Sequence, residues 1–188
     1  MNQPSTIHPP PRPGVNYDEL FKTPAVHQAR FFAIWAQISA RYQNRPANLL
    51  FELCNEPHDI DSARWNQMIL EVLPIIRSTN PRRGIIIGGT DWNSLKKLAE
   101  LKLPESDRFL IGTFHLYAPL KFTHQGAEWI PGSKAWLGTQ WLGSSEEKES
   151  IRIELDHAVD WWEKNRRPIW IGEFGSYSKA GLPSRCRW

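Results

Sequence analysis

Two glutamates lie where a pair of carboxylates could act together. Glu56 follows the apolar run 48–53 within Asn55-Glu56-Pro57, and Glu173 follows the apolar run 169–171. If both runs are strands of one parallel barrel, their carboxyl ends meet at one face and the two glutamates converge. Glycoside hydrolysis requires such a pair, one carboxyl to protonate the leaving oxygen and one to attack or to activate water. In the alternative interpretation, Glu56 caps the following helix and Glu173 pairs with a basic side chain.

A histidine and a tyrosine follow a third apolar run, 109–114. His115 and Tyr117 are two residues apart, so an extended chain places them on one face, where they could orient a carboxylate. A metal site built on His115 would need further ligands, and His58 and His124 are available for it. We expect neither a metal nor any other cofactor.

Strands and helices alternate along the chain. Thr23 and Pro24 begin a helix, Asp61 caps a second, and Ser144 with Glu147 resembles a capping box for a third. The predicted strands are 48–53, 84–88, 109–114 and 169–171, and a short helix is predicted at 94–101. Helix periodicity predicts that the last long helix packs through Ile151, Leu155, Ala158, Val159 and Trp162.

This alternation predicts a parallel sheet with crossover helices, either an open doubly wound sheet or a (β/α) barrel. An open sheet that binds a dinucleotide would carry a G-x-G-x-x-G turn, which is absent. Polar residues just past several strands favour the barrel, but a whole barrel typically needs about 250 residues. With 188 residues and four convincing strands, we expect an α/β fold that is part of a TIM barrel. Residues 1–14 read as an irregular proline-rich tail and 15–188 as one domain.

Composition excludes several other classes. There are 23 Lys and Arg against 20 Asp and Glu, a net charge of +3, and the basic residues are scattered, so we expect no nucleic-acid partner. There is no apolar run of about 18 residues and no signal peptide, so no membrane partner is expected. Cys54 and Cys186 are expected to be separate thiols. Ten tryptophans, with Trp129, Trp136 and Trp141 in the long loop 118–143, indicate a surface for flat amphipathic ligands such as sugars.

Four motifs in order resemble glycoside hydrolase family 5, and most closely its bacterial cellulases of subfamily 25. The motifs are LFELCNEP at 50–57, FHLY at 114–117, FTHQGAEW at 122–129 and GEFGSYSK at 172–179. The resemblance, which runs from about residue 17 to the end, implies a TIM barrel and a retaining endo-β-1,4-glucanase that acts on β-glucan. It implies Glu56 as general acid/base and Glu173 as nucleophile.

The same resemblance assigns the neighbouring residues. Asn55 would bind the sugar 2-hydroxyl, His115 and Tyr117 would line the reacting subsite, and Tyr117 would hydrogen-bond Glu173. We place Trp129, Trp136 and Tyr177 in the substrate-binding set as well.

The sequence departs from the family in three places. The His-His pair that usually precedes a segment like 17–20 is replaced by Val15-Asn16, and the first two strands and the eighth strand of the family have no counterpart. An inactive or carbohydrate-binding remnant is therefore the alternative to an active glucanase, and a metal-dependent hydrolase ranks below both. We also expect self-association through unpaired barrel edges. Secretion follows from the resemblance alone.

Overall fold

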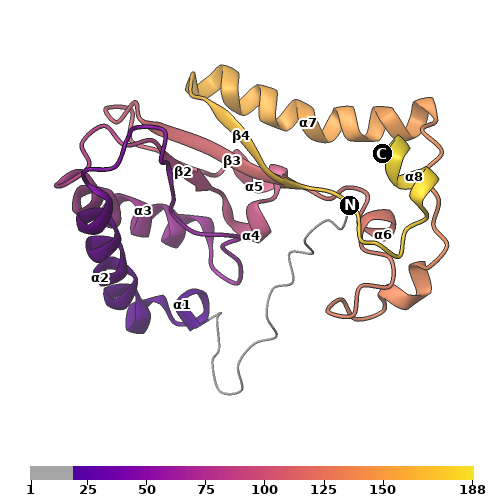
Figure 1. The fold of residues 1–188 in the computed structure, drawn as a ribbon, viewed down its shortest axis with the longest axis horizontal. Helices are drawn as coiled ribbons and strands as arrows, with labels where there is room; N and C mark the ends of the chain where they lie inside the picture. The colour runs from indigo at the N-terminus through magenta and orange to yellow at the C-terminus, as the bar shows by residue number, and fades with distance from the viewer. Residues whose placement is uncertain (1–18) are drawn as a thin grey trace.

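The computed structural model describes residues 19–188, and its centre is a sheet of four parallel strands (Figure 1). The strands are β1 (Phe51–Glu52), β2 (Ile85–Gly88), β3 (Leu110–Leu116) and β4 (Ile169–Phe174), and their order in the sheet is their order in the chain. This is part of a TIM barrel, as predicted. The predicted tail 1–14 and the predicted start of the domain at residue 15 lie outside the described residues.

Helices connect the strands and cover one face of the sheet. The longer helices are α2 (Pro24–Tyr42), α3 (Ser62–Arg77) and α7 (Ser145–Asn165). The shorter ones are α1 (Glu19–Lys22), α4 (Thr90–Asn93), α5 (Leu95–Leu98), α6 (Leu120–Thr123), the 3-10 helix η1 (Ser133–Trp136) and α8 (Leu182–Arg187). None of the helices at 19–188 is long and apolar enough to cross a membrane.

The predicted caps form. Asp61 accepts a hydrogen bond from the Arg64 amide at 2.8 Å, and Ser144 and Glu147 form a complete capping box. Satisfying these free amides fixes where α3 and α7 begin.

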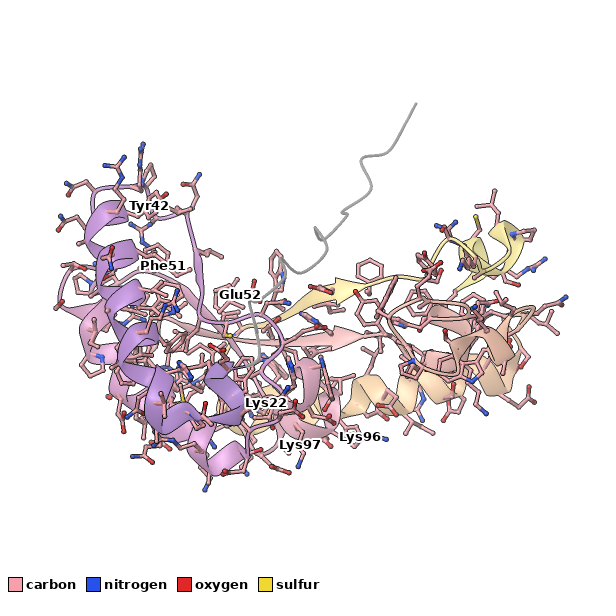
Figure 2. All side chains as sticks on the ribbon, turned by 90° about the horizontal axis from the view of Figure 1, so that it is seen from below. Lys22, Tyr42, Phe51, Glu52, Lys96 and Lys97 are labelled. Carbon is pink, nitrogen blue, oxygen red and sulfur yellow. The ribbon has the colours of Figure 1, made fainter. Side chains whose placement is uncertain are left out.

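The main hydrophobic core lies between α3 and the first three strands. The side chains of α3 that enter it are Trp65, Met68, Ile69, Val72, Leu73 and Ile76. All four residues of β2 are buried, as expected for a central strand of a parallel sheet. A second, smaller cluster consists of Phe122, Trp141 and Ala180, with Ile151 and Trp188 packed against it. The C-terminal helix α8 lies at the opposite end of the molecule from α2, whose last residue is Tyr42 (Figure 2).

Several predicted elements differ from the structure. β1 is two residues long rather than 48–53, because it pairs only with β2 and Leu49 and Leu50 remain exposed. The helix predicted at 94–101 is the single turn α5. The segment 118–143 is not one open loop, because it contains α6 and η1. α8 was not predicted.

The placement of three tryptophans also differs from expectation. On α7, Trp161 is buried and Trp162 is 44% exposed, the reverse of the predicted face. Trp161 takes the space above Gly112 of β3, where a Cβ atom would lie 2.6 Å from its ring. Trp141 belongs to the smaller core cluster rather than to a ligand surface.

Candidate active site

Glu56 stands on the loop that follows β1. Its backbone is in the left-handed region, with φ of 46°, and its carbonyl oxygen accepts a 2.8 Å hydrogen bond from Nδ1 of His58. The His58 ring in turn stacks on Trp92, with centroids 4.9 Å apart and planes within 7°. The loop is therefore anchored through its backbone, which leaves the Glu56 carboxylate free to act.

Glu173 stands near the end of β4, next to a β-bulge. Phe114 pairs with Ile171 and His115 pairs with Glu173, so Gly172 is the extra residue of the bulge. Bulges beside active sites redirect side chains. Here the bulge aligns Glu173 with His115.

Tyr117 holds the Glu173 carboxylate. Its hydroxyl donates to Oε2 of Glu173 at 2.7 Å, which is the hydrogen bond that the family resemblance implies. Burial, and after it this hydrogen bond, raises the pKa of Tyr117 well above its usual value. The hydroxyl therefore stays protonated, and remains a donor, at any working pH.

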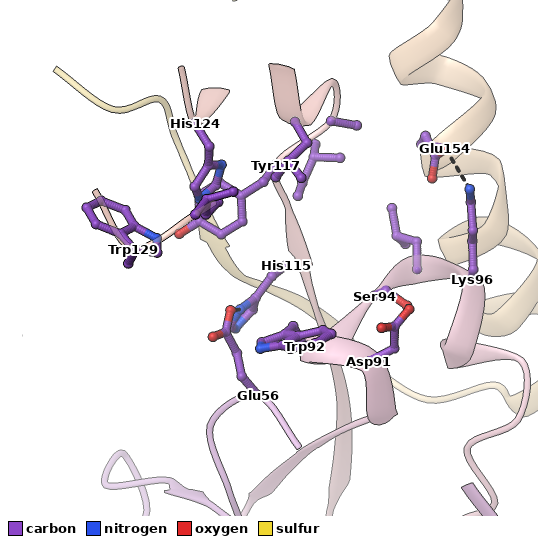
Figure 3. Close-up of a pocket in the computed structure, with 15 residues that line it drawn as sticks. Glu56, Asp91, Trp92, Ser94, Lys96, His115, Tyr117, His124, Trp129 and Glu154 are labelled. Carbon is purple, nitrogen blue, oxygen red and sulfur yellow. Dashed lines mark hydrogen bonds and ion pairs between the residues drawn. The ribbon is translucent and has the colours of Figure 1, made fainter. Parts of the chain in front are cut away.

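His115 contacts both glutamates, and Figure 3 shows its ring beside Glu56. Its side chain is 2% exposed, and Nδ1 is 2.8 Å from Oε1 of Glu56 and 3.6 Å from Oε2 of Glu173. Nδ1 and one oxygen of each carboxylate all lie within 4.8 Å of one another. The sequence therefore correctly predicts that these three side chains and Tyr117 come together.

A cleft of about 710 Å³ opens beside Glu56 (Figure 3). Its walls combine the aromatic rings of Trp92, Tyr117 and Trp129 with polar groups at the far end. Flat apolar rings with a few convergent polar groups suit sugar ligands. Glu173 is joined to this cleft through Tyr117.

The other predicted binding residues are placed as follows. Trp129 is 62% exposed and lines the cleft. Tyr177 packs edge-on against Trp129 at 4.9 Å, and its hydroxyl donates to Glu128 at 2.8 Å. Asn55 is exposed beside Glu56 but does not line the cleft, and neither does Trp136, which ends η1.

Sequence reasoning missed the turn after β2. Asp91, Trp92 and Asn93 all have left-handed backbones, with φ of 57°, 56° and 55°. For a residue such as Trp this conformation costs about 1 kcal/mol or more, and such strain clusters at functional sites. The turn sends Trp92, 50% exposed, into the cleft and buries Asn93. The signal that could have found it is the rule used for Glu56, since polar residues follow the strand ending at Gly88.

The three histidines of the metal interpretation do not form one site. Within residues 19–188, the three-ligand group with suitable spacing is Glu56, His115 and Glu173. His58 instead packs between Phe21 and Trp92, and His124 packs edge-on against Tyr117 at 4.9 Å. Burial lowers the pKa of His124. Cys54 and Cys186 are both free thiols, as predicted.

Two carboxylates and an aromatic cleft at the carboxyl ends of parallel strands are the arrangement of a barrel glycoside hydrolase. The comparisons with known proteins make this specific. The chain belongs to glycosyl hydrolase family 5, because the family's cellulase model matches residues 8–188.

Among curated relatives, endoglucanase H of Acetivibrio thermocellus is 41% identical over 160 residues, which cover 85% of this chain and 16% of that protein. Endoglucanase C of the same organism is 34% identical over 196 residues, which cover 90% of this chain and 56% of that protein. The crystal structure of endoglucanase Cel5A from Thermotoga maritima superimposes with a TM-score of 0.88 at 44% identity, covering 92% of this chain and 56% of that one. The chain thus spans little more than half of Cel5A and endoglucanase C.

Proposed function

We propose that this chain is a retaining endo-β-1,4-glucanase that hydrolyses β-glucan by double displacement at Glu56 and Glu173. The observation that carries the proposal is the cluster in which His115 contacts Glu56 and Tyr117 holds Glu173, with Glu56, His115 and Tyr117 lining an aromatic cleft. Membership of family 5 and relatives named endoglucanases support the same reaction.

The spacing of the carboxylates supports retention. Retaining enzymes hold the two carboxyl groups about 5 to 5.5 Å apart, whereas inverting enzymes hold them about 6.5 to 9.5 Å apart to admit a water molecule. One oxygen of Glu56 and one of Glu173 lie within 4.8 Å. This close approach is consistent with the shorter, retaining separation, in which a carboxylate itself attacks the sugar.

The contacts support the two roles that the family resemblance implies. Glu173 accepts the Tyr117 hydroxyl, which fixes its orientation for attack on the sugar. Glu56 protonates the leaving oxygen in the first step and, once ionised, removes a proton from the water that hydrolyses the glycosyl-enzyme intermediate. The His115 imidazole bonds Glu56 and keeps it beside Glu173.

Trp92 and Trp129 supply flat apolar surfaces for sugar rings along the cleft. Structures of Cel5A are described in complex with cellobiose and with mannotriose. We therefore propose a β-1,4-linked chain of glucose or mannose as the substrate class, with β-glucan first. Because such polymers do not enter cells, we place the action of the protein outside the cell.

A carbohydrate-binding remnant without activity is the second candidate. It is favoured by the sheet edges, since at 19–188 β1 pairs only with β2 and β4 only with β3. On β4, Trp170, Ile171 and Phe174 are 52%, 43% and 69% exposed. We propose that such edges also drive self-association of the chain.

Reducing-sugar release from soluble β-glucan, with Glu173→Gln as the control, distinguishes the two candidates. Release by the wild type that is lost in Glu173→Gln supports the glucanase. Binding of cello-oligosaccharides without release, equal in both proteins, would replace it with the binding remnant.

A further inference from the structure

Asn93 lies behind His115, on the side away from the glutamates. Its side chain is fully buried, and Nδ2 is 3.3 Å from Nε2 of His115. Oδ1 has no partner among residues 19–188, so the contact with His115 is the hydrogen bond that this buried carboxamide makes there. The left-handed turn of α4 brings it to this position.

Two glycines make room for this pair. A Cβ atom on Gly88 of β2 would lie 2.1 Å from Oδ1 of Asn93, and one on Gly172 of β4 would lie 3.0 Å from Nε2 of His115. The strands on both sides of β3 therefore lack a side chain where the pair sits. The glycines and the strained turn are independent features that serve the same contact.

The orientation of the carboxamide assigns the protons. Nδ2 of Asn93 faces the ring and can only donate, so Nε2 of His115 accepts and the proton of a neutral ring lies on Nδ1. We propose that Asn93 is a positioning residue that keeps His115 as the neutral Nδ1–H tautomer, with its single ring proton directed at Glu56 and Glu173. The proposal rests on the proposed function for its catalytic meaning, but the tautomer itself does not.

The surroundings of His115 show why such a device is useful. Oxygens of Glu56 and Glu173 lie 2.8 Å and 3.6 Å from Nδ1 of His115, Glu52 interacts with the imidazole electrostatically, and the Tyr117 ring packs edge-on against it. These carboxylates attract a proton to Nδ1, and the Asn93 amide disfavours a proton on Nε2, because two N–H groups would then face each other. A cationic His115 would stabilise ionised Glu56 and so oppose its role as the acid. Asn93 thus allows Glu56 to keep the proton that the first step consumes.

The ¹⁵N NMR spectrum of histidine-labelled protein at neutral pH tests the tautomer directly, with His115→Gln to assign the signals. We expect a protonated Nδ1 and an unprotonated Nε2 in the wild type. In Asn93→Asp the new carboxylate accepts from Nε2, so both nitrogens should be protonated. The matched control is Asn66→Leu, which removes another buried carboxamide, one that binds the Glu100 carbonyl and the Lys102 amide. It should leave the His115 signals unchanged.

Kinetics on soluble β-glucan test the consequence. Asn93→Leu should lower kcat about tenfold with little change in KM, and Asn93→Asp should move the alkaline limb of the pH profile to lower pH. A wild-type spectrum with the proton on Nε2, or both nitrogens protonated, would overturn the proposal. Changes in the His115 signals of Asn66→Leu as large as those in Asn93→Asp would also overturn it. If the wild type proves inactive while its spectrum shows Nδ1–H, the proposed function fails and the tautomer assignment stands.

Discussion

A central strand of the sheet, β2, and an end strand, β4, differ in how well they are covered. β2 is buried along its whole length beneath α3, whereas the four residues Trp170, Ile171, Gly172 and Phe174 of β4 are exposed. Yet Glu173 stands on the exposed strand β4, whereas Glu56 stands on the loop after β1, the strand that pairs with the buried β2. The difference teaches that packing and chemistry are separable here. The β2 side supplies the buried frame, and the β4 side contributes one carboxylate held by a hydrogen bond from the Tyr117 hydroxyl.

The largest expected effect concerns the two carboxylates, one from each side. Glu173→Ala should abolish hydrolysis of both polysaccharide and aryl glycosides, by about 10⁴-fold or more, because no covalent intermediate can form. Glu56→Ala should lose about 10² to 10⁴-fold on polysaccharide but far less in the first step on an aryl glycoside, whose leaving group needs no proton. Initial rates on both substrates measure this difference. Equal loss of both substrates in Glu56→Ala, with aryl-glycoside cleavage kept in Glu173→Ala, would reverse the two roles.

The free energy of unfolding should depend more on β2 than on β4, although the larger loss of activity is expected on β4. Ile87→Ala on β2 removes a fully buried side chain and should cost about 2 to 5 kcal/mol. Ile171→Ala on β4, where the side chain is 43% exposed, should cost about 1 kcal/mol or less. Urea unfolding followed by tryptophan fluorescence gives both values. Similar costs would show that β4 is covered in solution.

Cover for β4 could come from a second copy of the chain. We expect light scattering during gel filtration to show dimers or larger species whose fraction rises with concentration. Trp170→Lys, which places a charge on the exposed strand, should shift the population to monomer. Trp162→Lys, an equally drastic change on the exposed face of α7, is the control and should leave it unchanged. A monomeric wild type at high concentration contradicts self-association.

The smallest expected effect lies at the rim of the cleft. Hydrogen bonds from Lys179 and then Tyr177 lower the pKa of Glu128 from 4.5 to about 2. Because the folded pKa lies below the unfolded one, this pair stabilises the fold above pH 4.5 and loses that contribution as the pH falls towards 2. The gap in urea midpoint between wild type and Glu128→Gln should therefore be small and shrink from pH 6 to pH 3. The pair is exposed, so a gap that widens on acidification would point to another cause.

The sequence predicts the chemistry better than the packing, for physical reasons. Polar residues after buried strands converge in any parallel barrel, which is why Glu56, His115, Tyr117 and Glu173 could be predicted as a group. α7 carries apolar residues on more than one face, including the exposed Ile153, so periodicity could not decide between Trp161 and Trp162.

Backbone conformations that depart from residue preferences or from regular strand geometry were harder to predict. Nothing in residue preferences predicts a left-handed Trp92, because tertiary contacts impose that backbone. Regular alternation along β4 would place the Glu173 side chain on the same face of the sheet as Ile171, but the bulge at Gly172 breaks the alternation. Both missed features lie where the structure departs from regular geometry to build the site.

Because the strands follow chain order, a nascent polypeptide can add each one to an edge that has already formed. During synthesis, Glu56, Asn93 and His115 leave the ribosome before β4 does. Glu173 therefore arrives after these three residues, on a strand whose Trp170, Ile171 and Phe174 side chains remain exposed. The proposed catalytic pair is thus incomplete in a growing chain until β4 docks on β3, so the pair is assembled in one late step.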